Sequence, residues 1–371
     1  MKVLIATPYF WPRVGGMENY ARSLAVGLAE AGWEVAVVCG DPAVQGPVRT
    51  EVDSLAVWRL PIWKVVSNTP VNPAWWWWLR RIIRLERPDV INTHTPVPFM
   101  ADVVTWAAGR RPVVVTYHAA TLVKPGGIAM SLITRGYLAV QWLTLSRARA
   151  IIAISSYVSE QLPRWRGKTT VVTNAVSGVG AARTAPGAGL VFVNNLEPTH
   201  RWKGLELLLD AMAVLKREGA AIRLTVVGDG ADRPRYEEYV RELGLDELVR
   251  FAGMRRGAER DALIRQAAAL VLYPTTANDA FPTVLLEAWA QGAAVVAAAI
   301  GALPSLVQDG VTGMLVEPNN AVALAHRLRA AMADPGYLVV LGEAGRQLVA
   351  REYTWPMQLR RTRAVFENLI R

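Results

Sequence analysis

The sequence predicts an α/β protein built of two doubly wound, Rossmann-like domains that face a cleft. Short apolar runs alternate with helical stretches along the whole chain, and this alternation is typical of parallel sheets that helices cover on both faces. The alternation restarts after residues 177–189, a Gly-, Ala- and Pro-rich stretch that indicates an interdomain linker. With 371 residues, the chain is long enough for two domains that each bury a core.

The first half of the chain supplies one series of elements. Strands are expected over residues 2–7, 34–40, 88–94, 111–118, 148–155 and 169–175, and a helix over 17–32. In such sheets, ligands bind beyond the C-terminal ends of the strands. His94 and His118 lie at two of these ends, and Gly15-Gly16 follows a third. These residues are therefore candidate site residues.

A second series begins at residue 189. Strands are expected over residues 189–195, 222–230, 248–254, 269–275 and 293–299, and helices over 204–219, 233–244 and 283–292. An amphipathic helix over 355–371 follows the completed series. We therefore expect domains at 1–180 and 186–354, with the helix 355–371 packing back on the first domain.

Cysteine content and hydropathy indicate a cytoplasmic protein. The single cysteine, Cys39, excludes an internal disulfide framework and a cysteine-based zinc site, and it favours a reducing compartment. The apolar stretch after Met1 ends early at Pro8, whereas a secretory signal needs roughly 7–15 apolar residues, so a buried first strand is expected. No charge-free apolar run reaches the roughly 18–20 residues that span a bilayer. Peripheral binding at the inner face of the cell membrane stays open.

Charge is distributed unevenly between the two halves. Residues 1–185 hold 20 Lys and Arg against 10 Asp and Glu, whereas residues 186–371 hold 21 of each type. Eleven of the 14 tryptophans also lie in the first half. A basic, Trp-rich domain joined to a neutral domain favours an anionic partner or surface for the first domain. Nucleic acid is not expected as that partner, because no recognition motif accompanies the basic residues.

The most specific motif is NDAFPTVLLEAWAQGAAVV, residues 278–296. Pro282 is suited to the first turn of a helix, where its missing N–H costs little. At this positive helix end, a phosphate binds well to backbone amides that lack an acceptor. The amides expected to be such free donors are those of Thr283, Val284 and Leu285. Glu287 follows one turn later and is suited to accept two hydrogen bonds from a ribose diol. Taken alone, a capped helix with a solvated glutamate explains this motif equally well.

Two further residues extend the motif. Asp279 lies just before the helix, where it is suited to hold another hydroxyl. Lys203-Gly204 lies in the loop after the first strand of the second series and immediately before a helix. A lysine there can reach phosphate oxygens held over the neighbouring helix end. A lone Lys-Gly is more often part of an ordinary surface loop.

Ten motifs, taken together and in order, resemble the retaining glycosyltransferases of family 4, which have the glycosyltransferase-B fold. They include PRVGGMENYARSLAVGLAEAGWEVAVV, PDVINTHTP, WKGLELLLDAM, YPTTANDAFPTVLLEAWAQGAAVVA and GVTGMLVEP. The resemblance covers essentially the whole chain. It implies transfer of a sugar from a nucleotide-diphosphate sugar to a glycan or lipid-linked acceptor. The donor expected first is a UDP- or GDP-sugar. The resemblance also implies that neither a metal ion nor another cofactor is needed.

The resemblance implies roles for the residues that match the family. Lys203 neutralises the leaving diphosphate, Glu287 binds the ribose, and His118 meets the donor sugar near the reacting carbon; these are the expected catalytic residues. His94 is placed on the acceptor side, although a histidine at a strand end is more often a hydrogen-bonded supporting residue. The implied donor-binding residues are Gly15, Gly16, Asn174, Arg201, Lys203, Gly228, Phe251, Gly253, Asp279, Ala280, Phe281, Pro282, Thr283, Val284, Leu285 and Glu287.

Departures from the family pattern keep other functions open. Asp279 stands where the family usually has Glu, Asn195 where it usually has Arg, and Ser305 where Glu is common. Arg201 is the expected substitute for the missing arginine. A catalytically silent nucleotide-sugar-binding protein is therefore one alternative. A non-hydrolysing nucleotide-sugar epimerase is another, although four histidines in the whole chain count against it.

The stretch NPAWWWWLRRIIRLERPDV, residues 72–90, predicts a helix capped by Asn72 with Pro73 in its first turn. At roughly 100° per residue, the residues expected toward the sheet are Trp75, Trp78, Leu79, Ile82, Ile83 and Leu85, and those expected opposite are Arg80, Arg81, Arg84 and Arg87. Trp76 falls at the border and Trp77 among the arginines. Since an indole beside arginines is typical of a membrane interface, Trp76, Trp77, Arg80, Arg81 and Arg84 are expected to bind an anionic membrane or a lipid-linked acceptor. Packing against another part of the chain or a partner subunit is the alternative.

Overall fold

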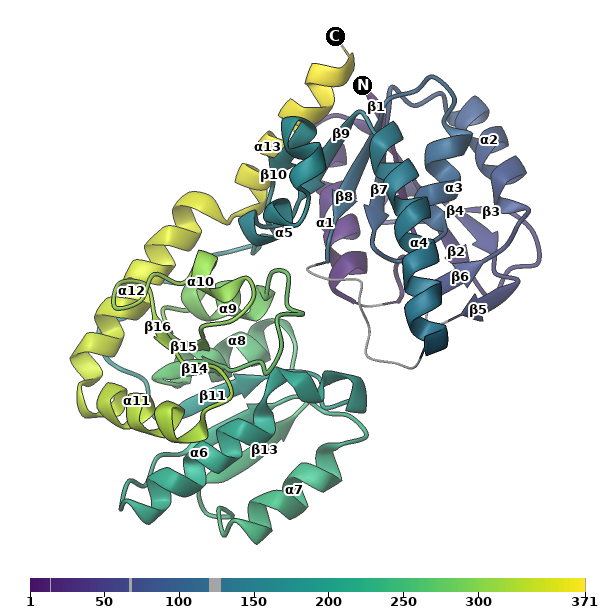
Figure 1. Cartoon of the computed structure of the whole chain (residues 1–371). Helices are drawn as coiled ribbons and strands as arrows, with labels where there is room; N and C mark the ends of the chain where they lie inside the picture. Colours follow the sequence, from purple (N-terminus) through teal and green to yellow (C-terminus); the bar gives the residue numbers. More distant parts are fainter. Residues whose placement is uncertain (14, 67–68, 120–127, 371) are drawn as a thin grey trace. The chain divides into compact units, whose positions relative to one another are not determined.

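The computed structural model describes residues 1–13, 15–66, 69–119 and 128–370, with the backbone alone described for residues 128–134 (Figure 1). The chain divides into two compact units: unit 1 comprises Met1–Asn174 and Trp355–Arg371, and unit 2 comprises Ala175–Thr354. Both units are α/β. The expected domain ranges, 1–180 for acceptor binding and 186–354 for nucleotide-sugar binding, remain predictions.

Unit 1 is built on an eight-stranded sheet with the order β10-β9-β8-β7-β1-β2-β4-β3. Its strands are β1 (Lys2–Thr7), β2 (Glu34–Asp41), β3 (Val48–Val52), β4 (Leu55–Pro61), β7 (Val90–Thr95), β8 (Val113–Tyr117), β9 (Ala150–Ala153) and β10 (Thr169–Val171). The central strands are almost wholly buried, as expected for a sheet covered on both faces; β1 and β8 are mainly apolar, whereas β7 also carries Asn92, Thr93, His94 and Thr95. The β3–β4 pair alone is antiparallel, and the sequence did not predict either strand.

Helices cover both faces of this sheet, and a short hairpin forms a separate two-stranded sheet. The helices of unit 1 are α1 (Gly16–Glu30), α2 (Trp75–Glu86), α3 (Met100–Ala107), α4 (Ile128–Arg147), α5 (Ser156–Glu160), the 3-10 helix η1 (Pro163–Lys168) and α13 (Trp355–Ile370). The hairpin consists of β5 (Lys64–Val66) and β6 (Thr69–Val71). Helices α2, α3 and α4 lie side by side in Figure 1, and α3 contacts both of the others.

The C-terminal helix α13 packs on α1 within unit 1. The ring of Trp355 lies 5.5 Å from that of Tyr20, and the fully buried ring of Phe366 lies 6.0 Å from that of Trp33. Phe366 belongs to the same apolar core as the strands of unit 1. The last helix of the chain is therefore part of the unit that contains the first strand.

The tryptophan-rich helix α2 divides its residues largely as expected. Trp75 is fully buried and its Nε1–H donates to the carbonyl of Pro61 at 2.9 Å, whereas Trp77 is 65% exposed. Two expectations are wrong. Leu85 is 59% exposed, because it lies in the last turn and about 100° from the centre of the stripe formed by the buried residues Trp75, Leu79, Ile82 and Ile83. Asn72 is not the cap residue: Ala74 is, and Asn72 Oδ1 instead accepts the Ala74 N–H at 3.0 Å in the turn before the helix.

Unit 2 is built on a six-stranded parallel sheet with the order β13-β12-β11-β14-β15-β16. Its strands are β11 (Leu190–Val193), β12 (Leu224–Val227), β13 (Val249–Gly253), β14 (Ala269–Leu272), β15 (Ala294–Ala298) and β16 (Met314–Val316). Its helices are η2 (Pro198–Lys203), α6 (Leu205–Arg217), α7 (Arg233–Glu242), α8 (Gly257–Gln266), α9 (Thr283–Ala290), α10 (Leu303–Leu306), α11 (Ala321–Ala333) and α12 (Pro335–Glu352). Aliphatic residues of these strands and of α6, α11 and α12 form one core.

The segment expected to be an interdomain linker is bound to unit 2. The guanidinium of Arg183 donates to the carbonyls of Gln291 at 3.1 Å and Ala267 at 2.8 Å. The amides of Gly180 and Ala188 donate to carbonyls of Ala290 and Gln266, each at 2.8 Å. Arg183 thus satisfies carbonyls at the C-terminal ends of α8 and α9 that would otherwise lack donors. The chain passes between the units earlier, between Asn174 and Ala175.

Candidate functional site

The residues expected in the site form one group in each unit. Unit 1 holds Gly15, Gly16, Trp76, Trp77, His94, His118 and Asn174, and unit 2 holds Arg201, Lys203, Gly228, Phe251, Gly253, Glu287 and the segment 279–285. All of the catalytic candidates except His118 therefore belong to unit 2.

Lys203 forms an ion pair with Asp279, and both side chains are largely buried. Gly204 fixes the loop that presents the lysine: it has φ +82°, and a Cβ there would lie 1.8 Å from the carbonyl oxygen of Tyr273. Only glycine fits such a position without displacing backbone. The Thr275 amide donates to the Trp202 carbonyl at 2.8 Å and anchors the same loop beyond the end of β14. The fold thus brings together two candidates that lie far apart in sequence.

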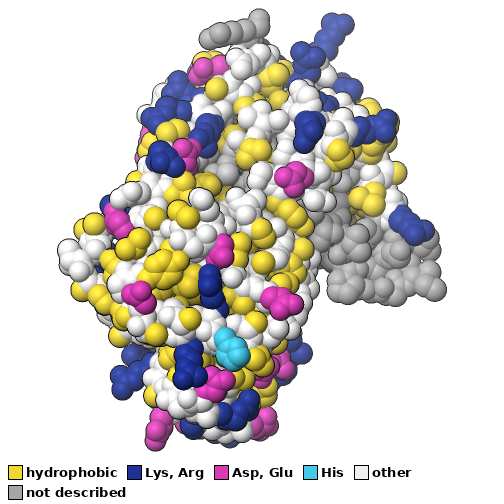
Figure 2. All heavy atoms as spheres, turned by 60° about the vertical axis from the view of Figure 1, so that its left-hand side comes forward, with side chains coloured by type: hydrophobic (Ala, Val, Ile, Leu, Met, Phe, Trp, Pro, Cys, Tyr) yellow, Lys and Arg dark blue, Asp and Glu magenta, His cyan; other side chains and the backbone are white. Residues whose placement is uncertain are grey.

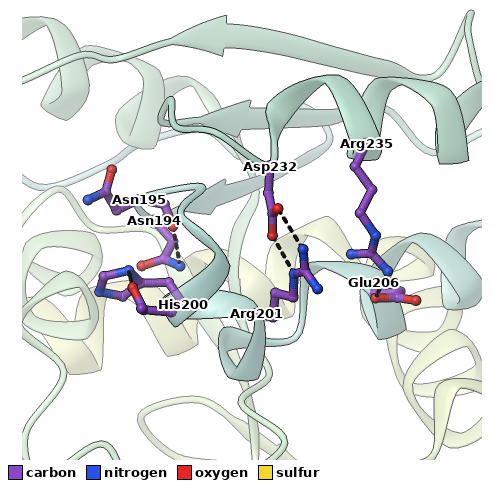
Figure 3. A network of polar contacts seen from close by, with 8 residues as sticks. Asn194, Asn195, His200, Arg201, Glu206, Asp232 and Arg235 are labelled. Carbon is purple, nitrogen blue, oxygen red and sulfur yellow. Dashed lines mark hydrogen bonds and ion pairs between the residues drawn. The ribbon is translucent and has the colours of Figure 1, made fainter.

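Arg201 also has an acidic partner. Its Nε and Nη2 lie 2.5 and 2.8 Å from the two carboxylate oxygens of Asp232, and Figure 3 shows the guanidinium turned toward that carboxylate. Asn194 and Asn195 lie on the other side of the view, where the Asn194 side chain donates to the Asn195 carbonyl at 3.0 Å (Figure 3). Arg201 therefore reaches a phosphate only if it leaves Asp232 or shares its donors with it.

The segment before α9 buries its apolar residues and exposes its polar end. Ala280 and Phe281 are buried, and the ring of Phe281 lies 6.0 Å from that of Tyr353. Pro282 is the N-cap residue of α9 in extended conformation. The expectation of three free amides is wrong in one respect, because the Leu285 amide donates to the Pro282 carbonyl at 3.2 Å. The exposed Thr283 stands at the positive end of the helix.

Glu287 forms an ion pair with Arg260 of α8, with 2.7 Å between Oε1 and Nη1. Burial raises the pKa of the Glu287 carboxyl above its usual value, and the nearby Arg260 guanidinium opposes this rise. Arg260 also donates to the carboxylate of Asp261 at 2.8 Å. No motif in the sequence marked Arg260 or Asp261, because α8 carries no pattern apart from ordinary helix-forming residues.

A pocket of about 490 Å³ opens beside this ion pair within unit 2. It is lined by the linker residues 175–180 and by Gly257, Arg260, Asp261, Glu287 and Gln291. The pocket thus has two carboxylates, a guanidinium and a side-chain amide on its wall, together with backbone of the linker. Such a wall can hydrogen-bond several hydroxyl groups at once.

The loops after β12 and β13 approach each other closely. Gly228 has φ +147°, and a Cβ there would lie 1.7 Å from the carbonyl oxygen of Asn194. The Gly228 amide donates to the Gly253 carbonyl at 2.9 Å. The guanidinium of Arg233 lies 6.0 Å from the half-buried ring of Phe251 and binds Asp229 at 3.1 Å. Gly228 therefore serves close packing of backbone after β12, whereas a Cβ on Gly253 would come no closer than 3.6 Å to a neighbouring side chain.

In unit 1, Gly15 caps α1 and Gly16 begins it. A Cβ on Gly16 would meet nothing within 4 Å, so the backbone there is open to a ligand. Asn174 ends the first of the two segments of unit 1, and its buried Oδ1 has no hydrogen-bond partner among the described residues. Both features leave polar backbone or side-chain atoms of the predicted site unused.

His94 and His118 are hydrogen-bonded to each other, with 2.9 Å between His94 Nδ1 and His118 Nε2. Tyr20 of α1 packs edge-on against both imidazoles, at ring distances of 5.8 and 5.0 Å. Burial lowers the pKa of His118 to about 3 and lowers that of His94 as well. Both rings are therefore neutral at physiological pH.

The hydrogen bond sets the position of the protons on this pair. His94 is fully buried, and its Nε2 has no partner among the described residues. A buried acceptor without a donor is less costly than a buried N–H without an acceptor. This favours a proton on His94 Nδ1, donated to His118 Nε2, and a proton on His118 Nδ1. His118 then presents an N–H donor on its other side.

No described helix is long and apolar enough to cross a membrane. In the same residues, no three His, Cys, Asp or Glu side chains gather closely enough to hold a metal ion.

Models of two protein families match consecutive parts of this chain. Residues 14–177 match the model described as "Glycosyltransferase Family 4", and residues 187–348 match that described as "Glycosyl transferases group 1". The chain is a family 4-like glycosyltransferase. The resemblance seen in the sequence motifs is confirmed, and the protein is a glycosyltransferase enzyme.

Curated relatives extend over nearly the whole chain. Glycogen synthase of Mycobacterium tuberculosis is 26% identical over 96% of this chain and 92% of its own length. D-inositol 3-phosphate glycosyltransferase of Salinispora tropica is 29% identical over 92% of this chain and 78% of its own. Phosphatidyl-myo-inositol mannosyltransferase of Propionibacterium freudenreichii is 26% identical over 96% and 92%.

Solved structures confirm the predicted fold class. Sucrose-phosphate synthase of Thermosynechococcus elongatus matches with a TM-score of 0.76 and 22% identity, covering 99% of this chain and 98% of that one. HepE of Anabaena, solved in complex with UDP, matches with a TM-score of 0.78 and 19% identity, covering 99% and 100%. The glycosyltransferase-B fold of two Rossmann-like domains is thereby established for this chain.

Proposed function

We propose that this glycosyltransferase moves a sugar from a nucleotide-diphosphate sugar, a UDP- or GDP-sugar, to a glycan or lipid-linked acceptor with retention of configuration. The observation that carries the proposal is the pairing of Lys203 with Asp279 beside the N-terminus of α9. A cation and a helix N-terminus in one loop region suit a diphosphate, and the released carboxylate suits a sugar hydroxyl. HepE, which has this fold, is solved with UDP and with UDP-glucose, and this supports a nucleotide-sugar donor.

In the proposed donor complex, Lys203 leaves Asp279 and forms an ion pair with the diphosphate. The ammonium and the first turn of α9 then stabilise the charge that develops on the leaving diphosphate. This positive charge takes the part that a divalent ion plays in other transferases, so we propose that neither a metal ion nor another cofactor is used. Glu287 accepts hydrogen bonds from the ribose diol at the wall of its pocket.

The proposed reaction needs no protein nucleophile. The bond between the anomeric carbon and the diphosphate oxygen breaks, and the acceptor oxygen attacks the oxocarbenium-like carbon from the same face. The acceptor proton passes to the departing phosphate. His118 takes part as a neutral hydrogen-bond donor through Nδ1 to a sugar oxygen, because burial keeps its pKa far below physiological pH.

We place the acceptor on the side of unit 1, and the reaction in the cytoplasm at the inner face of the cell membrane. The basic, Trp-rich character of residues 1–185 supports an anionic acceptor or surface. One relative is named for mannosyl transfer to phosphatidyl-myo-inositol, which supports a lipid-linked acceptor. Nucleic acid is not proposed as a partner.

A panel of UDP-, GDP- and ADP-sugars, incubated with the protein and with extracted membranes, tests the proposal. Release of nucleoside diphosphate together with an α- or β-product that matches the donor anomer supports it. Binding of nucleotide-sugar with no release under any condition favours the silent binding protein, for which Asn195 and Asp279 are the sequence arguments. Conversion to an isomeric nucleotide-sugar favours the epimerase.

A further inference from the structure

Helices α2, α3 and α4 form one layer over the sheet of unit 1 (Figure 1), and its outer surface is unusually rich in tryptophan. Trp77 of α2 is 65% exposed, Trp106 of α3 is 46% exposed, and Trp142 of α4 is 41% exposed. Leu138 and Leu143 of α4 are exposed to a similar degree. Exposed indoles on three neighbouring helices are not needed for the core of the unit.

Arginines accompany the indoles on this layer. Arg80 lies 4.6 Å from the ring of Trp76, Arg147 4.9 Å from Trp106, and Arg164 5.4 Å from Trp142. Such cation–π contacts hold each ring at the surface beside a positive charge. The further exposed arginines on or next to the three helices are Arg81, Arg84, Arg87, Arg110, Arg135 and Arg149.

No acidic side chain is free to balance this charge on the three helices. The acids in α2, α3 and α4 are Glu86 and Asp102. Glu86 pairs with Lys2 at 2.9 Å and accepts from Trp58 Nε1 at 2.7 Å. Asp102 is buried and accepts from Thr144 Oγ1 at 2.6 Å. The outer surface of the layer is therefore positive as well as aromatic.

We propose that the outer surface of the α2–α3–α4 layer docks on the anionic surface of a lipid bilayer. A bilayer offers, side by side, a negative headgroup layer for the guanidinium groups and an interfacial zone in which indoles are stable. The charge of the surface and the spread of its apolar residues over three helices fit such an extended partner.

The proposed docking surface includes more than the run of four consecutive tryptophans. Trp77 is the one residue of that run which is mostly exposed, whereas Trp76 is half-buried under Arg80. Trp106 and Trp142 come from other helices and carried no motif in the sequence. The proposal adds a docking surface to the acceptor side of the proposed function, and its biological use rests on that function. Lipid binding itself requires neither donor nor turnover.

Sedimentation of the full chain with vesicles tests this proposal. Vesicles of phosphatidylcholine alone are compared with vesicles that also contain phosphatidylglycerol, at low and at raised salt. The protein is expected to bind the anionic vesicles only, more weakly as salt rises, since each arginine near such a surface contributes about fivefold to binding. The double variant Trp77→Ser, Trp142→Ser is expected to bind at least tenfold more weakly.

Val340→Ser is the matched control. Val340 on α12 of unit 2 is 62% exposed, and Figure 2 shows basic and acidic side chains interspersed on the face where α11 and α12 come forward. This variant is expected to bind vesicles as the wild type does. Unfolding curves recorded by urea titration show whether the double variant is still folded.

Three results would overturn the proposal. One is an absence of binding to anionic vesicles at low salt. Another is equal binding by the wild type and a folded double variant, which would reduce the effect to unspecific attraction of charges. The last is a wild-type dimer that the double variant converts to monomer without any vesicle binding, which would make the layer a contact between two copies of the chain. Each is readable whether or not the protein turns over a donor.

Discussion

The Arg260 guanidinium lies 2.7 Å from the Glu287 carboxylate, at the wall of a pocket within unit 2. Burial raises the pKa of the Glu287 carboxyl, and the ion pair limits this rise because it favours the charged carboxylate. A ribose diol binds best to the ionised form, which accepts two hydrogen bonds. We therefore propose that Arg260, which no sequence motif marked, acts on donor binding through Glu287.

Replacing Arg260 by Gln is expected to make nucleotide binding more sensitive to acid. Without the guanidinium, the pKa of Glu287 rises, so the carboxylate is lost at a higher pH as the solution is acidified. Titration calorimetry with UDP and GDP over a pH series measures the pH at which affinity falls by half. This pH is expected to be higher in Arg260→Gln than in the wild type. An unchanged midpoint would show that Arg260 does not tune Glu287.

Replacing Glu287 itself by Gln is expected to weaken nucleotide binding by roughly 10- to 100-fold, since hydrogen bonds to a charged group contribute about 1.5–3 kcal/mol. The matched control is Glu247→Gln, a change of an exposed acid in the same unit. Its affinity for nucleotide is expected to equal that of the wild type. Equal affinities for Glu287→Gln and the wild type would remove Glu287 from the donor site.

The Lys203–Asp279 pair gives a prediction with two variants. Lys203→Ala removes the charge that stabilises the leaving diphosphate and is expected to lower turnover by about 10²–10³-fold, as loss of one preorganised donor does in other enzymes. It also leaves Asp279 buried without its cation, so Asp279→Asn in the same chain is expected to recover stability but not turnover. Urea midpoints and initial rates of nucleoside diphosphate release separate the two effects. Recovery of turnover in the double variant would contradict the assigned role of Lys203.

The histidine pair predicts a dependence of stability on pH. His118 has a pKa of about 3 in the folded protein against an ordinary value of 6.5, so between these values the unfolded chain binds more protons. Stability is therefore complete above pH 6.5 and falls as the pH drops below it, with a slope of up to about 1.4 kcal/mol per pH unit for one histidine.

The variant His118→Gln is expected to flatten part of this slope, because glutamine does not titrate. His326→Gln is the control, since His326 is 60% exposed and belongs to the other unit. Urea midpoints, followed through the tryptophan fluorescence that arises mostly from unit 1, give the measurement. Identical pH profiles for His118→Gln and the wild type would contradict the burial of a neutral pair.

The division of the tryptophan run predicts a contrast in stability. Trp75→Ala removes a fully buried ring that also donates to the Pro61 carbonyl and is expected to cost about 3–5 kcal/mol. Trp77→Ala changes a side chain that is 65% exposed and is expected to stay within about 0.5 kcal/mol of the wild type. Equal losses in the two variants would show that helix α2 is oriented differently.

The sequence predicted those features that repeat along the chain or depend on near neighbours. Apolar runs such as that of β1 showed the parallel strands, and Gly204 after Lys203 marked a loop before a helix. The strand β3, VRTEV, was missed because it lies at the sheet edge, where polar and apolar residues mix. Leu85 was assigned to the core because the helical phase takes no account of where the helix ends.

The sequence did not predict which charged side chains form ion pairs with one another. Lys203 and Asp279 are 76 positions apart, and Arg201 finds Asp232 across 31 positions. Such pairs depend on the geometry of whole loops and on side-chain rotamers, which no local pattern encodes. The resemblance to a family located the acids and bases, whereas the structure shows which of them are already neutralised by one another.

The most direct test of the central claim is the steady-state release of nucleoside diphosphate from UDP- and GDP-sugars in the presence of extracted membranes. We expect the wild type and Glu247→Gln to release nucleoside diphosphate at the same rate with at least one donor. We expect Glu287→Ala and Lys203→Ala each to lose most of this release while still folded. Release that survives in both of these variants, or no release by the wild type from any donor, would contradict a transferase that works through Lys203 and Glu287.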